Sequence, residues 1–121
     1  MAKVLISDAM DVIAEKILLE NNIEVDVKTD FTPDELITEI PSYDGLIVRS
    51  ATKVTKEIID KAKNLKLIGR AGAGVDNIDL STAKEKNIIV MNTPGGNTNA
   101  TAEHTLALLL SLSRKIPNAN T

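Results

Sequence analysis

The chain has 121 residues, of which 43% are hydrophobic and 26% charged, and this is enough for one compact domain with its own hydrophobic core. It contains no cysteine, which excludes disulfides, thiolate catalysis and cysteine-ligated zinc and favours a cytoplasmic location. Its longest leucine-rich stretch is too short to span a bilayer, so we expect no membrane partner.

The net charge of −3 is unevenly distributed, because acidic residues dominate positions 1–45 and basic residues dominate positions 46–75. The chain has one Phe, one Tyr and no Trp, so few rings could stack on nucleic-acid bases. A local basic segment in an acidic protein suits a small anionic ligand better than a nucleic acid, which needs a continuous positive surface.

The first quarter of the chain predicts a strand, a helix and a second strand. Residues 3–7 and 23–27 are short runs rich in β-branched residues, which is typical of strands. The segment between them has helical spacing, and Asn22 suits the left-handed residue that ends a helix. We expect the buried face of this helix to consist of Met10, Ile13, Ile17 and Leu18.

A capping box predicts the start of the second helix. Thr32 suits the N-cap, Pro33 the first helical position, and Glu35 follows three residues after the cap. Residues 45–49 then predict the third strand. Further helical segments at 54–65 and 80–87 alternate with strands predicted at 65–69 and 88–92.

The five predicted strands begin about every 21 residues, and a helical segment follows each of the first four, which implies parallel pairing through right-handed crossovers. A leucine-rich solenoid has a similar period, but its Leu/Asn consensus does not repeat here. We therefore predict an α/β fold: a flavodoxin-like five-stranded parallel sheet in the order 2-1-3-4-5 with helices on both faces.

After the fifth strand, Pro94, Gly95 and Gly96 disfavour both helix and strand and indicate a hinge. An apolar helix follows over residues 100–116, and it must be buried against another surface. The leucines that leave this helix little polar face are Leu106, Leu108, Leu109, Leu110 and Leu112.

The stretch "GRAGAGVDNI" (residues 69–78) looks like a phosphate-binding glycine loop but does not fit the dinucleotide fingerprint. That fingerprint needs glycine at its first, third and sixth positions, and counting from Gly72 the sixth position is Asn77. The acidic residue required at the end of the next strand is also missing, since Asn92 stands there.

The same loop fits a small-anion site, because ligands of parallel sheets bind beyond the carboxyl ends of the strands. Arg49 and Arg70 would close neighbouring strands whose backbones lie about 5 Å apart, and their guanidiniums repel unless an anion lies between them. Gly72 and Gly74 would let backbone N–H groups converge on a carboxylate or phosphate. The alternative is that each arginine pairs with a surface carboxylate and the glycines serve a tight turn.

Other candidates are weaker. Glu103 and His104 are adjacent on a helix and diverge too far to act as a ligand pair, so packing or a surface role is expected for His104. Asp8 and Asp11 resemble the acidic pair of a phospho-receiver domain, but such a domain needs an aspartate where Arg49 stands. We therefore interpret both acids as helix caps and expect no metal site.

Four motifs, "GLIVRSATKVT", "GRAGAGVDNIDL", "IIVMNTPGGNT" and "AEHTLALLLSLSRKIP", resemble the amino-terminal part of the D-isomer-specific 2-hydroxyacid dehydrogenases, and "VRSAT" with "GRAGAGVDN" suggests the phosphoglycerate branch. The resemblance implies a two-domain, NAD-dependent enzyme with its GxGxxG motif and catalytic residues in a Rossmann domain beyond this chain. The chain alone should then have no catalytic residue and be inactive. The implied parts are a substrate-binding domain (1–94), a hinge (95–99), a connecting helix (100–116) and a tail (117–121).

The resemblance also implies which residues contact the substrate. Arg49 and Arg70, with Ser50 beside them, would bind the phosphate of 3-phosphoglycerate, which the enzyme oxidises to 3-phosphohydroxypyruvate in the first step of serine biosynthesis. Asn97 would contact the substrate from the hinge. The backbone N–H groups that would hold the carboxylate belong to Ala73, Gly74 and Val75.

The resemblance places Ala73 near the nicotinamide of NAD. Many relatives have Thr at this position and Asn at the position of Gly95, so a side-chain contact from Ala73 to the cofactor is not expected. Relatives use the helix at 100–116 in dimer contacts, and this chain should therefore self-associate through that helix or fold it back over the sheet.

A function of another class is a stand-alone flavodoxin-like module that binds an anion or regulates a partner. The two hypotheses require different sequences beyond residue 121: a strand and a GxGxxG motif within about 30 residues would favour the dehydrogenase.

Overall fold

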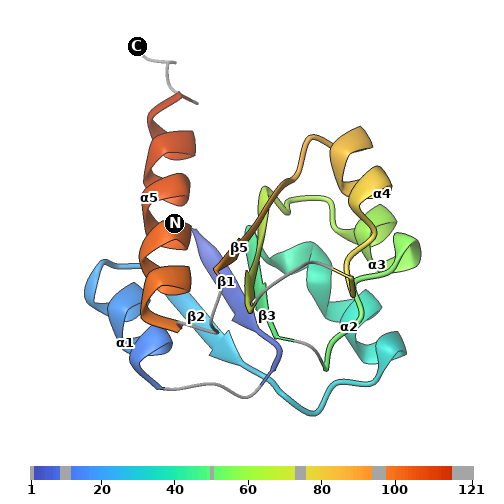
Figure 1. Ribbon diagram of the computed structural model, residues 1–121, viewed down its shortest axis with the longest axis horizontal. Coiled ribbons are helices and arrows are strands. Elements are labelled where there is room, and N and C mark those ends of the chain that lie inside the picture. The colour runs from blue at the N-terminus through green and yellow to red at the C-terminus, as the bar shows by residue number, and fades with distance from the viewer. Residues whose placement is uncertain (1, 9–11, 50, 73–75, 94–97, 116–121) are drawn as a thin grey trace.

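A computed structural model gives the three-dimensional structure and describes residues 2–8, 12–49, 51–72, 76–93 and 98–115, with backbone only for residues 98 and 112–115. The described residues form a five-stranded parallel sheet in the order β2-β1-β3-β4-β5, which confirms the predicted flavodoxin-like order (Figure 1). Its strands are β1 (Lys3–Ile6), β2 (Glu24–Val27), β3 (Gly45–Val48), β4 (Leu67–Ala71) and β5 (Ile89–Thr93).

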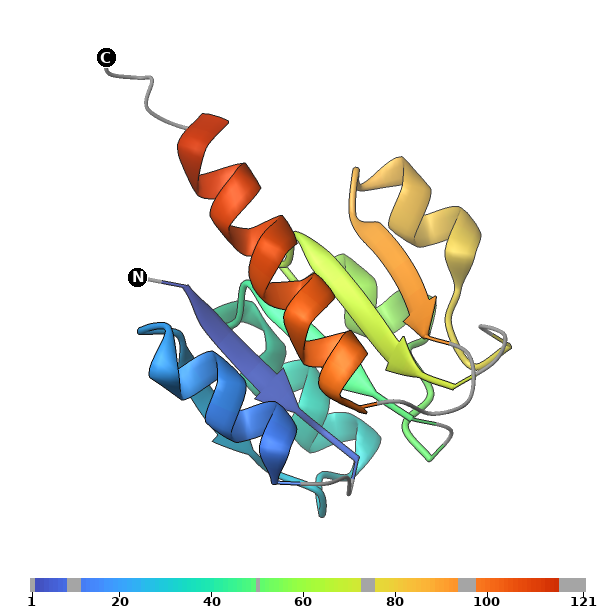
Figure 2. The same cartoon turned by 60° about the vertical axis from the view of Figure 1, so that its left-hand side comes forward.

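Helices cover both faces of this sheet. One face packs against α1 (Ile13–Glu20) and α5 (Thr98–Lys115), which lie side by side over the sheet and run roughly along its strands in Figure 2. The other face packs against α2, the short 3₁₀ helix η1, α3 and α4. Their bounds are Pro33–Glu39, Ile40–Ser42, Lys56–Lys61 and Leu80–Glu85.

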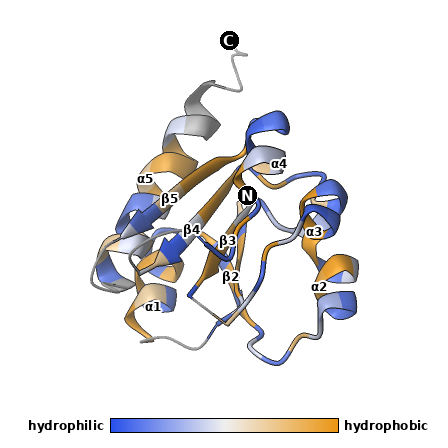
Figure 3. Ribbon diagram, turned by 45° about the vertical axis from the view of Figure 1, so that its right-hand side comes forward, coloured by the Kyte–Doolittle hydropathy of each residue, from blue (hydrophilic) through white to orange (hydrophobic). Residues whose placement is uncertain are grey.

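Two apolar clusters, one on each face, form the core. Because successive strand residues point to opposite faces, Leu46 and Val48 pack toward α2 and α3, whereas Ile47 packs toward α1 and α5. Hydrophobic residues are concentrated on the central strands in Figure 3, and hydrophilic residues lie on the outward sides of α3 and α4. The central strands are covered on both faces, as parallel sheets require.

Local signals placed several helix ends correctly. Thr32 and Glu35 form the predicted capping box, with the Glu35 N–H bonded to the Thr32 hydroxyl at 3.2 Å and the Glu35 carboxylate bonded to the Thr32 N–H at 2.8 Å. Asn22 adopts the expected left-handed conformation, with φ of 64°. The predicted face of α1 is wrong in part, because Ala14 and Leu18 are buried while Ile13 is 37% exposed. Met10 lies outside the described residues.

The fourth strand differs from its predicted bounds of 65–69, because it begins at Leu67 and runs to Ala71. Leu65 is buried, but it lies in the turn before the strand. The ladder with β3 and β5 determines the start, since Leu67 pairs with Gly45 on one side and with Ile89 on the other. Arg70 therefore lies inside β4 instead of after it.

The helix expected at 100–116 folds back over the sheet as α5, which is one of the two arrangements predicted for it. That face of the sheet has room for α5, because α1 is the only other helix that covers it among the described residues. Leu109 is buried, but Leu110 is 43% exposed. Among the α5 side chains that the structure describes, the other buried ones are the small residues Thr101, Ala102 and Thr105. Within the described residues, no helix has the length and apolar character that crossing a bilayer requires.

Candidate anion-binding site

The carboxyl ends of all five strands meet at one edge of the sheet, because the strands are parallel. Polar residues follow or end four of them: Asp8 after β1, Arg49 after β3, and Arg70 and Asn92 near the ends of β4 and β5. This edge is where an open α/β sheet binds its ligand. The structure therefore brings the two arginines predicted for the anion site to the same edge.

The register changes how the two guanidiniums can meet. Arg70 pairs with Val48, so Arg49 lies one residue farther along and just past the end of β3. Successive residues of a strand project to opposite faces, so Arg49 and Arg70 do not start from the same face of the sheet. The guanidiniums can share an anion only beyond the edge, where both long side chains reach past the backbone.

The Arg70 guanidinium lies at the start of the glycine loop. A Cβ atom added to Gly72 would lie 3.6 Å from its Nη1 atom, so the guanidinium packs against the Gly72 backbone. Asn92 pairs with Arg70 across the ladder, and its Nδ2 atom donates to the Gly72 carbonyl at 3.4 Å. The residue that replaces the acid of a dinucleotide site therefore supports the glycine loop.

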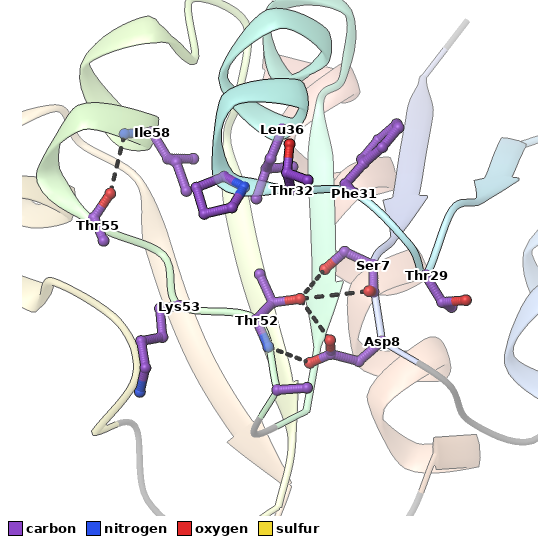
Figure 4. Close-up of a pocket in the computed structure, with 12 residues that line it drawn as sticks. Ser7, Asp8, Thr29, Phe31, Thr32, Leu36, Thr52, Lys53, Thr55 and Ile58 are labelled. Carbon is purple, nitrogen blue, oxygen red and sulfur yellow. Dashed lines mark hydrogen bonds between the residues drawn. The ribbon is translucent and has the colours of Figure 1, made fainter.

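Asp8 is 5% exposed and binds the segment after β3 (Figure 4). Its Oδ2 atom accepts hydrogen bonds from the backbone N–H groups of Arg49 at 2.7 Å and Thr52 at 3.0 Å. Its Oδ1 atom accepts a bond from the Thr52 hydroxyl. The prediction that Asp8 caps a helix is wrong, since the N-cap of α1 is Val12 and makes no side-chain capping bond. Asp11 lies outside the described residues.

Asn77 binds the same segment from its other side. Its Nδ2 atom donates to the carbonyl oxygens of Arg49 at 2.7 Å and Thr52 at 2.6 Å. Its own backbone carbonyl accepts from the Val54 N–H at 2.7 Å, and Val54 forms an isolated parallel bridge with Ile78. The sequence indicated Asn77 only as the residue that breaks the fingerprint, so its contacts, and those of Thr52, were missed.

A cavity of about 340 Å³ lies behind this segment, between it and the connection from β2 to α2. Figure 4 shows its apolar side, formed by Phe31, Leu36 and Ile58, and the bonded group of Ser7, Asp8 and Thr52 at its base. Neither Arg49 nor Arg70 lines it, so it is separate from the predicted anion site.

A cluster at the amino end of β1 shifts the pKa values of two of its members. Tyr43 donates a hydrogen bond of 2.7 Å to Asp26, and Lys3 lies 3.6 Å from the same carboxylate. The Tyr43 hydrogen bond, helped by Lys3, lowers the pKa of Asp26. Burial and the bond to Asp26 raise the pKa of Tyr43 above its ordinary value. This cluster stabilises the fold and lies away from the candidate site.

Several predicted site residues lie outside the described part of the chain: Ser50, Ala73, Gly74, Val75 and Asn97. Their contacts with substrate or NAD stay predictions. His104 is exposed on α5. The described residues contain no group of three or more His, Cys, Asp or Glu side chains placed to hold a metal ion.

The family model of the D-isomer specific 2-hydroxyacid dehydrogenase catalytic domain matches residues 4–120. The chain belongs to this family. It is 52% identical over 118 residues to a D-3-phosphoglycerate dehydrogenase of Archaeoglobus fulgidus, covering 98% of this chain and 22% of that relative. The chain thus spans about a fifth of the length of the curated relatives that it matches.

Solved structures share this fold. A protein from Pyrococcus horikoshii superposes with a TM-score of 0.73 at 35% identity, covering 99% of this chain and 36% of that one. The NAD⁺-bound 3-phosphoglycerate dehydrogenase of Entamoeba histolytica superposes with a TM-score of 0.71 at 36% identity, covering 89% of this chain and 38% of that one.

Proposed function

We propose that this chain is the substrate-binding part of an NAD-dependent dehydrogenase that oxidises 3-phosphoglycerate to 3-phosphohydroxypyruvate. Family membership supports the reaction class, and relatives named D-3-phosphoglycerate dehydrogenase support the substrate. The observation that carries the proposal is the carboxyl edge of the sheet, where the Arg70 guanidinium lies against the glycine loop and the segment bearing Arg49 is held beside it.

In this proposal the chain binds and orients the substrate. Arg49 and Arg70 neutralise the phosphate with charge-assisted hydrogen bonds, assisted by Ser50. The N–H groups of residues 73–75 hold the carboxylate, and Asn97 contacts the substrate from the hinge. Holding both ends of 3-phosphoglycerate fixes its C2 atom, and such orientation lowers the barrier by several kcal/mol, on the order of what intramolecular reactions gain.

The described residues do not fit a dinucleotide site, since the sixth fingerprint position is Asn77 and β5 carries Asn92 where the acidic residue is needed. NAD, which accepts the hydride in this reaction class, would therefore be held mainly by residues beyond these 121, with Ala73 near its nicotinamide. We accordingly expect the 121-residue chain to bind substrate without turning it over.

The test is a titration of the ¹⁵N-labelled chain with 3-phosphoglycerate and with D-lactate, which lacks the phosphate. We expect saturable shifts of the Arg49, Arg70 and Gly72 amides with 3-phosphoglycerate and much weaker ones with lactate. Arg49→Gln and Arg70→Gln should each weaken binding roughly tenfold or more, because each removes a charged hydrogen-bond donor. Lys84→Gln, which neutralises an exposed charge on α4, is the matched control.

Equal responses to the two ligands, or shifts that avoid the arginines, would contradict the phosphate assignment. Inorganic phosphate binding as tightly as 3-phosphoglycerate would favour a stand-alone anion-binding module instead.

We further infer that the protein is cytoplasmic and self-associates through α5. The support for self-association is Leu110, a large apolar side chain that remains 43% exposed on that helix.

A further inference from the structure

The segment after β3 carries Arg49, whose backbone is bonded to side chains instead of to a neighbouring strand. β3 ends at Val48, so Arg49 lies beyond the paired residues of the sheet. Its N–H donates to the carboxylate of Asp8, and its carbonyl accepts from the amide of Asn77. Two side chains from other parts of the chain therefore hold the two backbone polar groups of Arg49.

The position of Asp8 favours this contact. The Ser7 N–H donates to the Ile47 carbonyl at 3.1 Å, which extends the β1–β3 ladder and brings Asp8 level with the residues after β3. The carboxylate then accepts bonds from both Arg49 and Thr52. Asn77 repeats the pattern with the carbonyls of the same two residues.

A buried carboxylate at this edge opposes anion binding, because like charges repel more strongly where water is excluded. Asp8 therefore cannot assist the phosphate by direct contact. Its effect on binding must act through the segment that it holds, where its charge is balanced by three hydrogen-bond donors.

We propose that Asp8 and Asn77 are positioning residues that fix the backbone of Arg49 from both sides, so that its guanidinium is presented to the phosphate of the substrate. The inference rests on the proposed function of Arg49. An unrestrained backbone at this position would spread the long arginine side chain over many directions, and each contact with the phosphate would then cost more conformational entropy.

The test uses Asp8→Asn and Asn77→Ala in the 121-residue chain, with affinity measured calorimetrically for 3-phosphoglycerate and for D-glycerate, which lacks the phosphate. In Asp8→Asn, an amide NH₂ group that cannot accept a hydrogen bond replaces one of the two carboxylate oxygens, and the negative charge is also removed. A positioning role predicts roughly tenfold weaker binding of 3-phosphoglycerate with little change for D-glycerate, on the scale of one lost charged hydrogen bond. A purely electrostatic role of Asp8 predicts tighter binding.

The matched controls remove similar bonds at the opposite edge of the sheet. Asp44 accepts from the Lys3 N–H at 2.9 Å, and Asn64 donates to the Pro41 carbonyl at 2.8 Å. Asp44→Asn and Asn64→Ala should leave both affinities unchanged. Amide spectra of each variant establish that it is folded, and Asn77→Ala tests the proposal alone if Asp8→Asn does not fold.

A double-mutant cycle with Arg49→Gln completes the test. Once Arg49 is replaced, Asp8→Asn and Asn77→Ala should have no further effect on 3-phosphoglycerate binding. Unchanged or tighter binding by both variants, or equal losses with and without Arg49, would overturn this inference and leave the proposed function standing. A native chain that binds no 3-phosphoglycerate would overturn both.

Discussion

Tyr43 and Asp26 form a partly buried hydrogen bond whose contribution to stability depends on pH. Tyr43 is 2% exposed and donates to Asp26, whose pKa lies below its ordinary value of 3.8 mainly because of this bond. A carboxyl whose pKa is lowered on folding stabilises the native state above its unfolded pKa, and this stabilisation is lost as the pH falls through the folded pKa.

We predict that Tyr43→Phe lowers the free energy of unfolding by about 1 kcal/mol at pH 7 and by less once the pH has fallen far enough below 3.8 to protonate Asp26 in the folded chain. Urea unfolding at pH 7 and at a series of acid pH values measures the difference. In an Asp26→Asn background the effect of Tyr43→Phe should no longer depend on pH. A loss that stays the same at every pH in the native background would show that packing of the ring, and not the bond, is responsible.

Residue roles could be predicted where the partners are neighbours in sequence. Thr32 and Glu35 cap a helix across three positions, and the left-handed conformation of Asn22 needs no distant contact. Asp8 was assigned wrongly because its partners, Arg49 and Thr52, lie 41 and 44 positions away. A cap is the default interpretation of an aspartate before a helix, and only the β1–β3 pairing shows otherwise.

At the scale of whole elements, the packing of α5 on β4 depends on the absence of a side chain at Gly69. A Cβ atom there would lie 3.2 Å from Cε of Met91, 3.3 Å from Oγ1 of Thr105 and 3.4 Å from Cγ2 of Thr101. The flexible Met91 side chain can move aside, but Thr105 is fully buried, so its side chain has little room to rotate away. The small residues on the inner side of α5 thus match a strand position that has no side chain.

We predict that Gly69→Ala lowers the free energy of unfolding by about 1 kcal/mol through overpacking, although alanine is otherwise the better strand residue. Thr105→Ala in the same chain should relieve the contact, so that the double variant is more stable than the sum of the two single effects predicts. Chemical denaturation of the four chains gives the coupling energy. Additive effects would mean that α5 does not approach β4 as closely as the structure shows.

Element types were predictable, and the bounds and buried faces less so. The capping box and the β-branched runs are local patterns, and they gave α2 and the strands. Leucine content suggested the buried side of α5, but the residues that approach Gly69 are Thr101 and Thr105, and Leu110 is exposed. The hydrophobicity of the residues alone does not predict the close approach of α5 to Gly69.

For the whole molecule, the strand order could be predicted because the regular spacing of strands and helices leaves few ways to connect a parallel sheet with right-handed crossovers. The register of β4 could not, because it depends on ladders with two neighbours at once, and it moved Arg70 into the strand. Both arginines were therefore predicted at the edge of the sheet where the structure places them, and their binding of an anion stays a prediction. The hydrogen bonds of Asp8, Asn77 and Thr52 around Arg49 were not predicted.

The association of whole chains is the last prediction. Leu110 is exposed on α5, whereas its neighbour Leu109 is buried in the core beneath the same helix. If the chains associate through α5, Leu110→Lys should weaken self-association at least roughly tenfold in sedimentation equilibrium and leave the unfolding transition unchanged, because it places a charge in the contact but not in the core.

Leu109→Lys is the contrasting variant, and it should unfold the chain because a lysine at that position buries an unpaired charge. Self-association that is insensitive to Leu110→Lys would move the contact to another surface, where the exposed Val12 and Leu19 of the α1 region become the next positions to substitute. A native chain that sediments as a monomer at all concentrations would refute association through α5. It would also indicate that the fold-back over the sheet buries enough of the helix by itself.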